Sequence, residues 1–275
     1  MSEPWLLWDN LLASGSLTAS SADDAGLHGA ALAVDGRPFV GHWQPARLAT
    51  QEWLQVDLGA GNGALADTAA LIDHDLSSCS PYGAAWRVQY SDDGGTWYDA
   101  LPDRTPADDS CDFGKFSCAF PHRFWRILLT NGGPGNFTAF PRIGQLVLGR
   151  RIDFPIGLQP GFDPQTEKPQ QSAPVSSAGV FLGTAVKYVE RSFELSFEAK
   201  TGFAPDFFAD AVQGLDRWWN EHAGRKGRGF FFAWDDARER PSWCRVEPGS
   251  TYNAPWGETF LNRGLKLKLQ ALVEV

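Results

Sequence analysis

Five histidines are the residues of this chain that most readily suggest chemistry, and each stands alone. One of them, His74, lies between Asp73 and Asp75, an arrangement that suits a metal ligand or a general acid. No histidine has a second histidine or a glutamate three or four residues away, the spacing that lets two side chains converge on one metal ion. We therefore expect His74 to be a loop histidine with local hydrogen bonds.

Nucleophilic chemistry has no recognisable arrangement in the sequence. The four cysteines lack the Cys-x-x-Cys spacing of a zinc site, so buried thiols are expected, with a bridge between Cys111 and Cys118 left open. The sequence contains no Gly-x-Ser-x-Gly turn and no nucleotide-binding glycine loop. It offers no reason to single out a glycosidase pair among 33 acidic residues. We therefore expect a protein without enzymatic activity.

Composition limits the classes of protein to consider. With 275 residues, 43% of them hydrophobic, the chain can form a sizeable core, and 29 glycines with 18 prolines indicate many turns between short strands. The formal net charge of -9 argues against non-specific nucleic-acid binding, which needs a basic surface. No apolar run approaches the roughly 20 residues that span a bilayer, and the amino-terminal residues show no secretory signal. We therefore expect a protein that folds in a cytoplasm without membrane insertion.

Several stretches of the first half alternate in the manner of half-buried β-strands. Residues 52–59 alternate apolar and polar side chains, and residues 85–90, 124–129 and 143–148 are further apolar strands. The dipeptide Asp93-Gly94 supplies the positive φ angles of a tight hairpin turn. Short strands at close spacing, without a convincing helix, predict a β-sandwich or barrel.

Six sequence blocks follow one another in order through this half. They are residues 18–21, 33–36 with Trp43, 53–59, 86–94 with Trp97, 124–127 and 143–149. On these blocks, residues 14–149 resemble a discoidin, or coagulation-factor C-type, domain. The resemblance implies a galactose-binding-like jelly-roll β-sandwich, and we take residues 1–149 as that domain.

The resemblance also implies that ligands bind at loops at one end of the sandwich, where such domains bind sugars, lipid headgroups or protein partners. The residues expected in those loops, as a candidate sugar-binding site, are His74, Tyr82, Asn131, Asn136 and Phe137. A group of tryptophans is instead expected in the core, because large aromatic side chains dominate such interiors. These are Trp43, Trp53, Trp86, Trp97 and Trp125.

A structural calcium ion is a further implication of the resemblance. The family's calcium site draws on an Asp-Gly loop, here Asp35-Gly36, and on an acidic residue in the last strand. The last-strand position in this chain is Gln145, so Asp35 keeps half of the pattern and is the calcium candidate. No other cofactor is expected.

The second half begins with a change in composition. Five prolines between residues 150 and 179 indicate a linker or an extended arm rather than a packed element. The residues that follow, 180–275, alternate in several places like half-exposed or buried strands. The expected strands are residues 188–198, 229–234, 243–247 and 265–275.

One helix is expected in this half, over residues 205–223. A proline and an aspartate suit its first turn, a glycine is placed to end it, and apolar residues recur between them at helical spacing. On this order of elements, and on stretches such as 191–197 and 229–232, about residues 151–275 resemble the distal-tail and tail-tube proteins of phage baseplates, and we take residues 180–275 as that domain. The resemblance implies a split β-barrel flanked by the helix.

The two resemblances together predict a structural subunit of a phage or phage-like tail. Such a subunit would form a cyclic homo-oligomer, six-fold being favoured, and would contact other tail and baseplate proteins. Its discoidin-like accessory domain would bind host-surface glycan or a neighbouring tail protein. We expect the protein in a virion tail assembled in the cytoplasm of the bacterial host. The alternative is a carbohydrate-binding protein, or the binding module of a glycan-degrading system.

Overall fold

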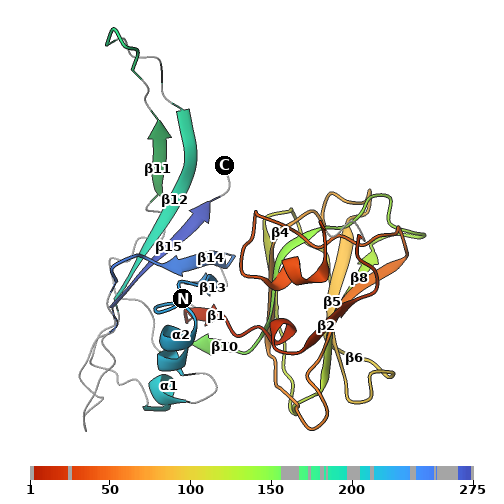
Figure 1. Cartoon of the computed structure of the whole chain (residues 1–275). Helices are drawn as coiled ribbons and strands as arrows, with labels where there is room; N and C mark the ends of the chain where they lie inside the picture. Colours follow the sequence, from red (N-terminus) through yellow and green to blue (C-terminus); the bar gives the residue numbers. More distant parts are fainter. Residues whose placement is uncertain are drawn as a thin grey trace. The chain divides into compact units, whose positions relative to one another are not determined.

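The computed structural model of the chain is mainly β and divides into two compact units (Figure 1). One unit is Leu7–Arg151; the other comprises the residues up to 6 and those from 152 onward. None of the described helices is long and apolar enough to cross a membrane. The structure describes residues 3–23, 27–155, 167–172, 175–179, 183, 185–196, 205–210, 214–235, 240–250, 252 and 266–273.

The unit Leu7–Arg151 is a β-sandwich of two antiparallel sheets, as predicted. The larger sheet has the order β2-β3-β8-β5-β6, and the smaller one has the order β7-β4-β9. Two short 3₁₀ helices, η1 (Leu11–Ala13) and η2 (Ala30–Val34), accompany the sheets. The strands are β2 (Ser16–Ala19), β3 (Gln51–Asp57), β4 (Thr68–His74), β5 (Ala84–Ser91), β6 (Tyr98–Arg104), β7 (Cys111–Lys115), β8 (Phe124–Asn131) and β9 (Ile143–Gly149).

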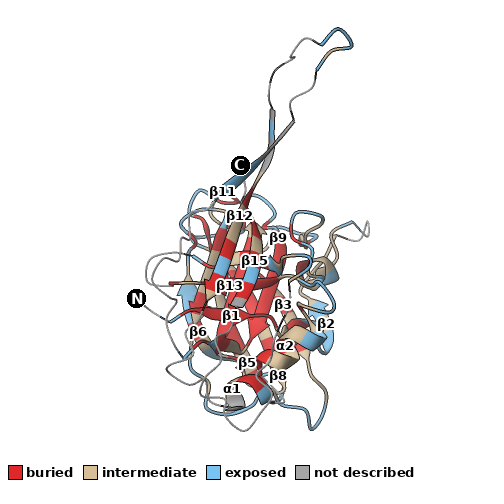
Figure 2. Ribbon diagram, turned by 90° about the vertical axis from the view of Figure 1, so that its left-hand side faces the viewer, coloured by how far each residue is buried: buried red, intermediate tan, exposed pale blue. Residues whose placement is uncertain are grey.

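Alternation along the strands decides which side chains enter the core between the two sheets. On β3, Leu54 and Val56 are buried while their neighbours are half-exposed, as the period of two requires. Figure 2 shows how buried residues are distributed along the strands. Trp43, Trp86 and Trp125 are fully buried in this core. Trp53 and Trp97, also expected there, are only half-buried. Trp53 falls between the buried positions of β3, and Trp97 lies in the turn before β6.

The predicted hairpin joins β5 to β6. Gly94 has a φ of +73°, and the Asp93 carboxylate closes the turn by accepting hydrogen bonds from Thr96 N (2.7 Å), Gly95 N (2.8 Å) and Ser91 Oγ (2.9 Å). These donors, the backbone N–H of Thr96 first, stabilise the charged form and lower the pKa of Asp93 to about 2. The turn therefore holds its shape through one ionised side chain.

A second carboxylate, that of Glu52, is completely buried near the start of β3. Its Oε2 accepts hydrogen bonds from Ser20 Oγ and from Ser21 Oγ (3.0 Å), and Arg47 Nε lies 3.6 Å from its Oε1. Burial of a carboxylate requires such partners, because each lost hydrogen bond to a charged group is expensive. The contacts tie the residues that follow β2 to β3.

The other unit is built on a seven-stranded sheet with the order β10-β1-β13-β14-β15-β12-β11. Within the described residues this sheet is open and forms no closed barrel, where the resemblance implied a split β-barrel. Its strands are β1 (Trp5–Leu7), β10 (Arg151–Asp153), β11 (Glu167–Ser172), β12 (Ala185–Ser196), β13 (Phe230–Ala233), β14 (Ser242–Val246) and β15 (Lys266–Val273). The predicted strand positions 197–198, 265, 274 and 275 lie outside the described residues.

Two segments enter this sheet that the sequence placed elsewhere. The strand β1 lies between β10 and β13, although its residues were assigned to the first domain. The expected linker contributes β10 and β11, and β11 pairs antiparallel with β12 as a long hairpin (Figure 1). Residues 156–166 of that expected linker lie outside the described residues. A strand of three residues such as β1 is too short for alternation to reveal its partner.

The single helix predicted over residues 205–223 is replaced by two short helices, α1 (Pro205–Ala209) and α2 (Leu215–Glu221). Gly214 precedes α2 in an extended conformation, and a Cβ there would lie 2.3 Å from the carbonyl oxygen of Phe208. The close approach explains why a glycine stands at this position. Residues 211–213 lie outside the described part of the chain. From α2, Trp218 packs edge-on against Phe230 of β13, with ring centroids 5.0 Å apart.

Cys111 and Cys118 do not form a disulfide. Cys111 opens β7, whereas Cys118 follows its last residue. The four steps of strand from Cys111 to Lys115 span roughly 13 Å, whereas a disulfide tolerates a Cα separation of only about 7 Å. The strand carries the chain away from Cys111 before Cys118 is reached, and the bridge that the sequence left open is absent.

We predict that Glu52→Ala destabilises the sandwich by about 2 kcal/mol, because Ser20 and Ser21 lose their common acceptor. Glu52→Gln should lose less stability, since its amide oxygen can still accept a hydrogen bond from Ser20 or Ser21. Native-state hydrogen exchange of the slowest amides of β3 and β8 in the full chain measures the change. Gln51→Ala, at an exposed neighbouring position, is the matched control. Equal exchange rates in Glu52→Ala and Gln51→Ala would show that the buried carboxylate does not stabilise the fold.

Candidate functional site

Four loops leave the sandwich at the same end, which we call the loop-rich end. They follow β2, β4, β6 and β8 and comprise the described residues of 20–50 (20–23 and 27–50), with 75–83, 105–110 and 132–142. The strand registers bring them together, because Gln51 pairs with Thr130, Ala84 with Asn131, and His74 with Ile143. All five residues expected in a sugar site belong to this end.

Three of the predicted residues lie where two loops are bonded to each other: Tyr82 and Asn136 in the loops, and Asn131 at the end of β8. Ser80 Oγ donates to Asn131 Oδ1 (2.7 Å), and Asn131 Nδ2 donates to the carbonyl oxygen of Asn136 (3.1 Å). Gly132 N donates to the carbonyl oxygen of Gly83 (2.9 Å). Asn131 therefore fixes the two loops, while Tyr82 and Asn136 are exposed on them.

The Tyr82 ring is the most distinctive feature of this surface. The residue is 61% exposed, an unusual degree for a large aromatic side chain. Gly133 lies directly beneath the ring, since a Cβ there would come within 2.2 Å of Tyr82 Cδ2. The glycine thus permits the ring to lie against the backbone of the neighbouring loop. An aromatic face supported in this way is presented to solvent with little freedom left to lose on binding.

The other two predicted residues, His74 and Phe137, are buried. Phe137 packs in the core, and its N–H donates to the carbonyl oxygen of Ala49 (2.9 Å). His74 is 5% exposed; its Nδ1 accepts from Leu76 N (3.3 Å) and lies 3.9 Å from Asp109 Oδ1. Burial is the main reason why the pKa of His74 is lowered. Both side chains support the loops from inside rather than facing a ligand.

An ion pair at the loop-rich end was not anticipated from the sequence. Arg142 donates to both carboxylate oxygens of Asp75, from its backbone N to Oδ1 (2.6 Å) and from Nε to Oδ2 (2.7 Å). The Arg142 side chain is nevertheless half-exposed. The two residues are 67 positions apart, so no local pattern could have paired them.

Two histidines lie near this ion pair. The rings of His28 and His42 are stacked, with centroids 4.3 Å apart and an interplanar angle of 19°. Burial, followed by the charges of His28 and Arg142, lowers the pKa of His42, while Asp73 and Asp75 act in the opposite direction. Burial therefore favours the uncharged form of the His42 ring.

The backbone beside these residues adopts an unusual conformation. Phe39 and Asp73 both have positive φ angles, +67° and +57°, which bulky side chains rarely adopt. Phe39 N donates to Asp73 Oδ2 (2.8 Å), so each residue holds the other in place. Phe39 is 40% exposed as a result, and Val40 next to it is more exposed still. Apolar side chains thus flank the polar groups of the loop-rich end.

The Asp35-Gly36 loop contains the residues implied for calcium. Asp35 is engaged by Arg37, whose backbone N donates to Oδ1 (2.8 Å) and whose Nε donates to Oδ2 (3.0 Å). Gly36 N donates to Gln145 Oε1 (2.8 Å), so a neutral amide holds the loop. One carboxylate with both oxygens engaged does not fit a calcium ion, which takes six or more oxygen ligands. Among the described residues, no three His, Cys, Asp or Glu side chains are grouped to hold a metal.

Comparisons with known proteins give likenesses over about half of the chain. The sequence matches no protein-family model and no curated protein. Chitosan-binding module 1 of a chitosanase/glucanase from Paenibacillus sp. IK-5 is 24% identical, with 51% of this chain and 98% of that chain covered and a TM-score of 0.39. A carbohydrate-binding module from Clostridium perfringens, in complex with GalNAc-β-1,3-galactose, is 16% identical, with 51% and 99% covered and a TM-score of 0.41.

An F5/8 type C domain from Bacteroides fragilis is also similar. It is 15% identical, with 52% of this chain and 95% of that chain covered and a TM-score of 0.38. Because these TM-scores are below 0.5, the likenesses carry no argument about function. The β-sandwich assignment rests on the sheets and the core described above.

We predict that the sandwich loses stability as the pH falls from 7 to 5. The pKa values of His42 and His74 are lowered from the usual 6.5 in the folded protein, chiefly by burial. As the pH falls through 6.5 the unfolded chain therefore gains protons that the folded protein does not, and unfolding becomes more favourable until the lowered folded-state pKa values are reached. Hydrogen exchange of β3 and β8 amides, corrected for intrinsic rates, measures the effect. His74→Asn, which keeps an acceptor for Leu76 N, should reduce the pH dependence; an unchanged dependence would contradict the assignment.

Proposed function

We propose that the unit Leu7–Arg151 is a carbohydrate-binding module whose ligand stacks on Tyr82 at the loop-rich end. The observation that carries the proposal is the exposed Tyr82 ring supported by Gly133. Sugar rings have apolar faces that pack on aromatic rings, and their hydroxyl groups hydrogen-bond at the edges of such a platform. A ring that is already oriented binds with a smaller entropic cost than a mobile one.

Polar groups suited to sugar hydroxyls lie in the same loops. The exposed Asn136 lies in the same loop as Gly133, on which the Tyr82 ring rests. Arg142, paired with Asp75, offers guanidinium donors next to carboxylate acceptors, the combination that binds neighbouring hydroxyl groups. Arg142 and Asp75 come from the same two loops as Asn136 and Tyr82, and we assign them to the polar rim of the site.

The proposed role is binding without catalysis. The histidine with two acidic neighbours, His74, is buried, and its Nδ1 accepts a backbone hydrogen bond. A general acid or base must reach the atom whose proton it transfers. His74 is instead placed to support the loop that ends in Tyr82.

We predict that Tyr82→Ala abolishes glycan binding or weakens it at least tenfold, while the sandwich unfolds at an unchanged temperature. Gly133→Ala should also weaken binding, because its methyl group displaces the Tyr82 ring. A glycan array containing chitotriose and GalNAc-β-1,3-galactose identifies the ligand, and calorimetry with the full chain gives the affinities.

The chain provides a matched control for this experiment. Tyr98 is 57% exposed, nearly as much as Tyr82, and it stacks on Tyr90 at the end of β5 away from the loop-rich end. Tyr98→Ala should therefore leave glycan binding intact. Equal losses in Tyr82→Ala and Tyr98→Ala, or no binding to any glycan, would overturn the proposed site.

A ring-forming subunit of a phage or phage-like tail is the second proposal, and it concerns the other unit. The observation that favours it is the open seven-stranded sheet, in which β10 and β11 are edge strands among the described residues. Unpaired backbone groups on an edge strand can pair with a second copy, and head-to-tail pairing closes a ring. The carbohydrate-binding module would then bind glycan from a virion tail assembled in the host cytoplasm.

We predict a cyclic homo-oligomer, six-fold being favoured, for this second proposal. Mass photometry and negative-stain imaging of the full chain at increasing concentration measure the subunit number. A protein that is monomeric at every concentration and in its native particle would contradict the ring, and the carbohydrate-binding proposal would be unaffected.

A further inference from the structure

A tight turn after β14 brings two polar side chains together in the unit with the seven-stranded sheet. Residues 247–250 have proline second and glycine third, and Gly249 has a φ of +84°, which is the pattern of a type II turn. Ser250 N donates to the carbonyl oxygen of Glu247 (3.1 Å) and closes it. The turn is fastened to β15 because Glu247 N donates to the carbonyl oxygen of Lys268 (2.9 Å). The first and fourth side chains of such a turn are close neighbours.

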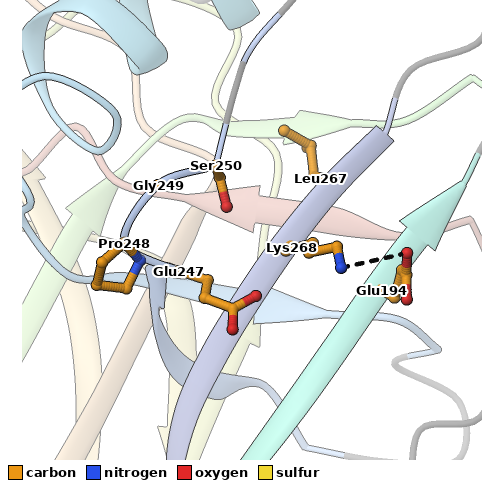
Figure 3. Close-up of a pocket in the computed structure, with 7 residues that line it drawn as sticks. All are labelled: Glu194, Glu247, Pro248, Gly249, Ser250, Leu267 and Lys268. Atoms are coloured by element: carbon orange, nitrogen blue, oxygen red, sulfur yellow. Dashed lines mark ion pairs between the residues drawn. The ribbon is translucent and has the colours of Figure 1, made fainter.

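A cavity of about 440 Å³ lies between this turn and the strands β12 and β15. Its volume is within the range of about 300 to 1,000 Å³ that is usual for ligand pockets. Figure 3 shows the side chains of Glu247 and Ser250 approaching β15 from the turn, with Lys268 and Glu194 beyond them. Lys268 and Glu194 are neighbours because the strand register pairs Glu194 of β12 with Lys268 of β15.

The charges of the lining do not cancel. Lys268 Nζ lies 3.6 Å from Glu194 Oε1, so these two side chains form an ion pair. Glu247 adds a second carboxylate on the other side of Lys268, and the three side chains together carry one net negative charge. The Ser250 Oγ atom is buried and has no hydrogen-bond partner among the described residues. Buried hydroxyl groups usually have partners, so this atom points to a missing one.

We propose that this cavity binds a ligand through a primary ammonium group, such as that of an amino sugar or of a lysine side chain. An ammonium group carries three donors and no acceptor. Glu247 supplies the balancing charge and a carboxylate acceptor, and Ser250 Oγ supplies a second acceptor. An anionic ligand would meet the excess negative charge. The site is independent of the proposed carbohydrate site, because it lies in the other unit.

Nuclear magnetic resonance titration of the full chain at pH 6.5 tests the proposal. Glucosamine and Nα-acetyl-lysine amide are the two ammonium probes, and N-acetylglucosamine and Nα-acetyl-norleucine amide are their neutral counterparts. We expect at least one ammonium probe to shift the amide signals of Gly249 and Ser250 saturably, and the neutral compounds to leave them unchanged. Which ammonium probe binds distinguishes a sugar from a peptide source.

Variants connect the shifts to the lining side chains. Glu247→Gln should weaken binding of the ammonium probe about tenfold, since it removes a charge-assisted hydrogen bond. Ser250→Ala should weaken binding of the same probe several-fold. Glu167→Gln, a carboxylate of β11 that is not part of the lining, is the matched control and should change nothing. Tyr82→Ala should also leave these shifts intact. Absence of shifts with both ammonium probes, equal shifts with the neutral compounds, or unchanged affinity in Glu247→Gln would overturn the proposal.

Discussion

The buried carboxylate of Glu52 is the contact on which the loop-rich end depends. Two serines that follow β2 donate to it, and one of them, Ser21, also accepts from Trp43 Nε1 through its carbonyl oxygen (3.1 Å). Trp43 in turn exchanges two backbone hydrogen bonds with Ile143 of the smaller sheet (2.9 and 3.1 Å). These contacts connect the Glu52 carboxylate of the larger sheet to β9 of the smaller sheet through the loop that follows β2. Because a buried carboxylate tolerates few arrangements of donors, Ser20 and Ser21 are held in a defined position where the chain leaves β2.

Most of the sandwich could be predicted from the sequence because its strands are long enough to show a period of two. The hairpin turn was equally clear, since Asp93 and Gly94 satisfy its geometry locally. The other unit was harder. Apolar spacing over residues 205–223 fits one helix, but Gly214 allows a close backbone approach that separates two. The pairing of the strands could not be predicted from the sequence either. The period of a strand shows which side chains are buried but not which strand lies beside it.

The candidate site was predicted in its location but only partly in its chemistry. Loop membership placed Tyr82 and Asn136 at the correct end of the sandwich, but it could not tell that His74 and Phe137 turn inward. Whether a loop side chain points to solvent depends on contacts from other loops, as the support of Tyr82 by a glycine 51 positions later shows. The turn at residues 247–250 has a readable local signal in its proline and glycine. The position of this turn next to Lys268 has no local sequence signal, because that contact is set by the pairing of β14 with β15.

The position of β1 has a consequence for how the chain is made. In the sheet order β10 is next to β1, so the chain leaves this sheet after β1 and returns to it on the neighbouring strand. The sandwich is therefore an insertion between two adjacent strands of another domain. During synthesis it can fold as soon as its last strand has left the ribosome, whereas β1 must wait for β13, roughly 80 residues after β10, to reach its second neighbour. Evolution could have added or removed such an inserted domain without cutting the sheet that carries it.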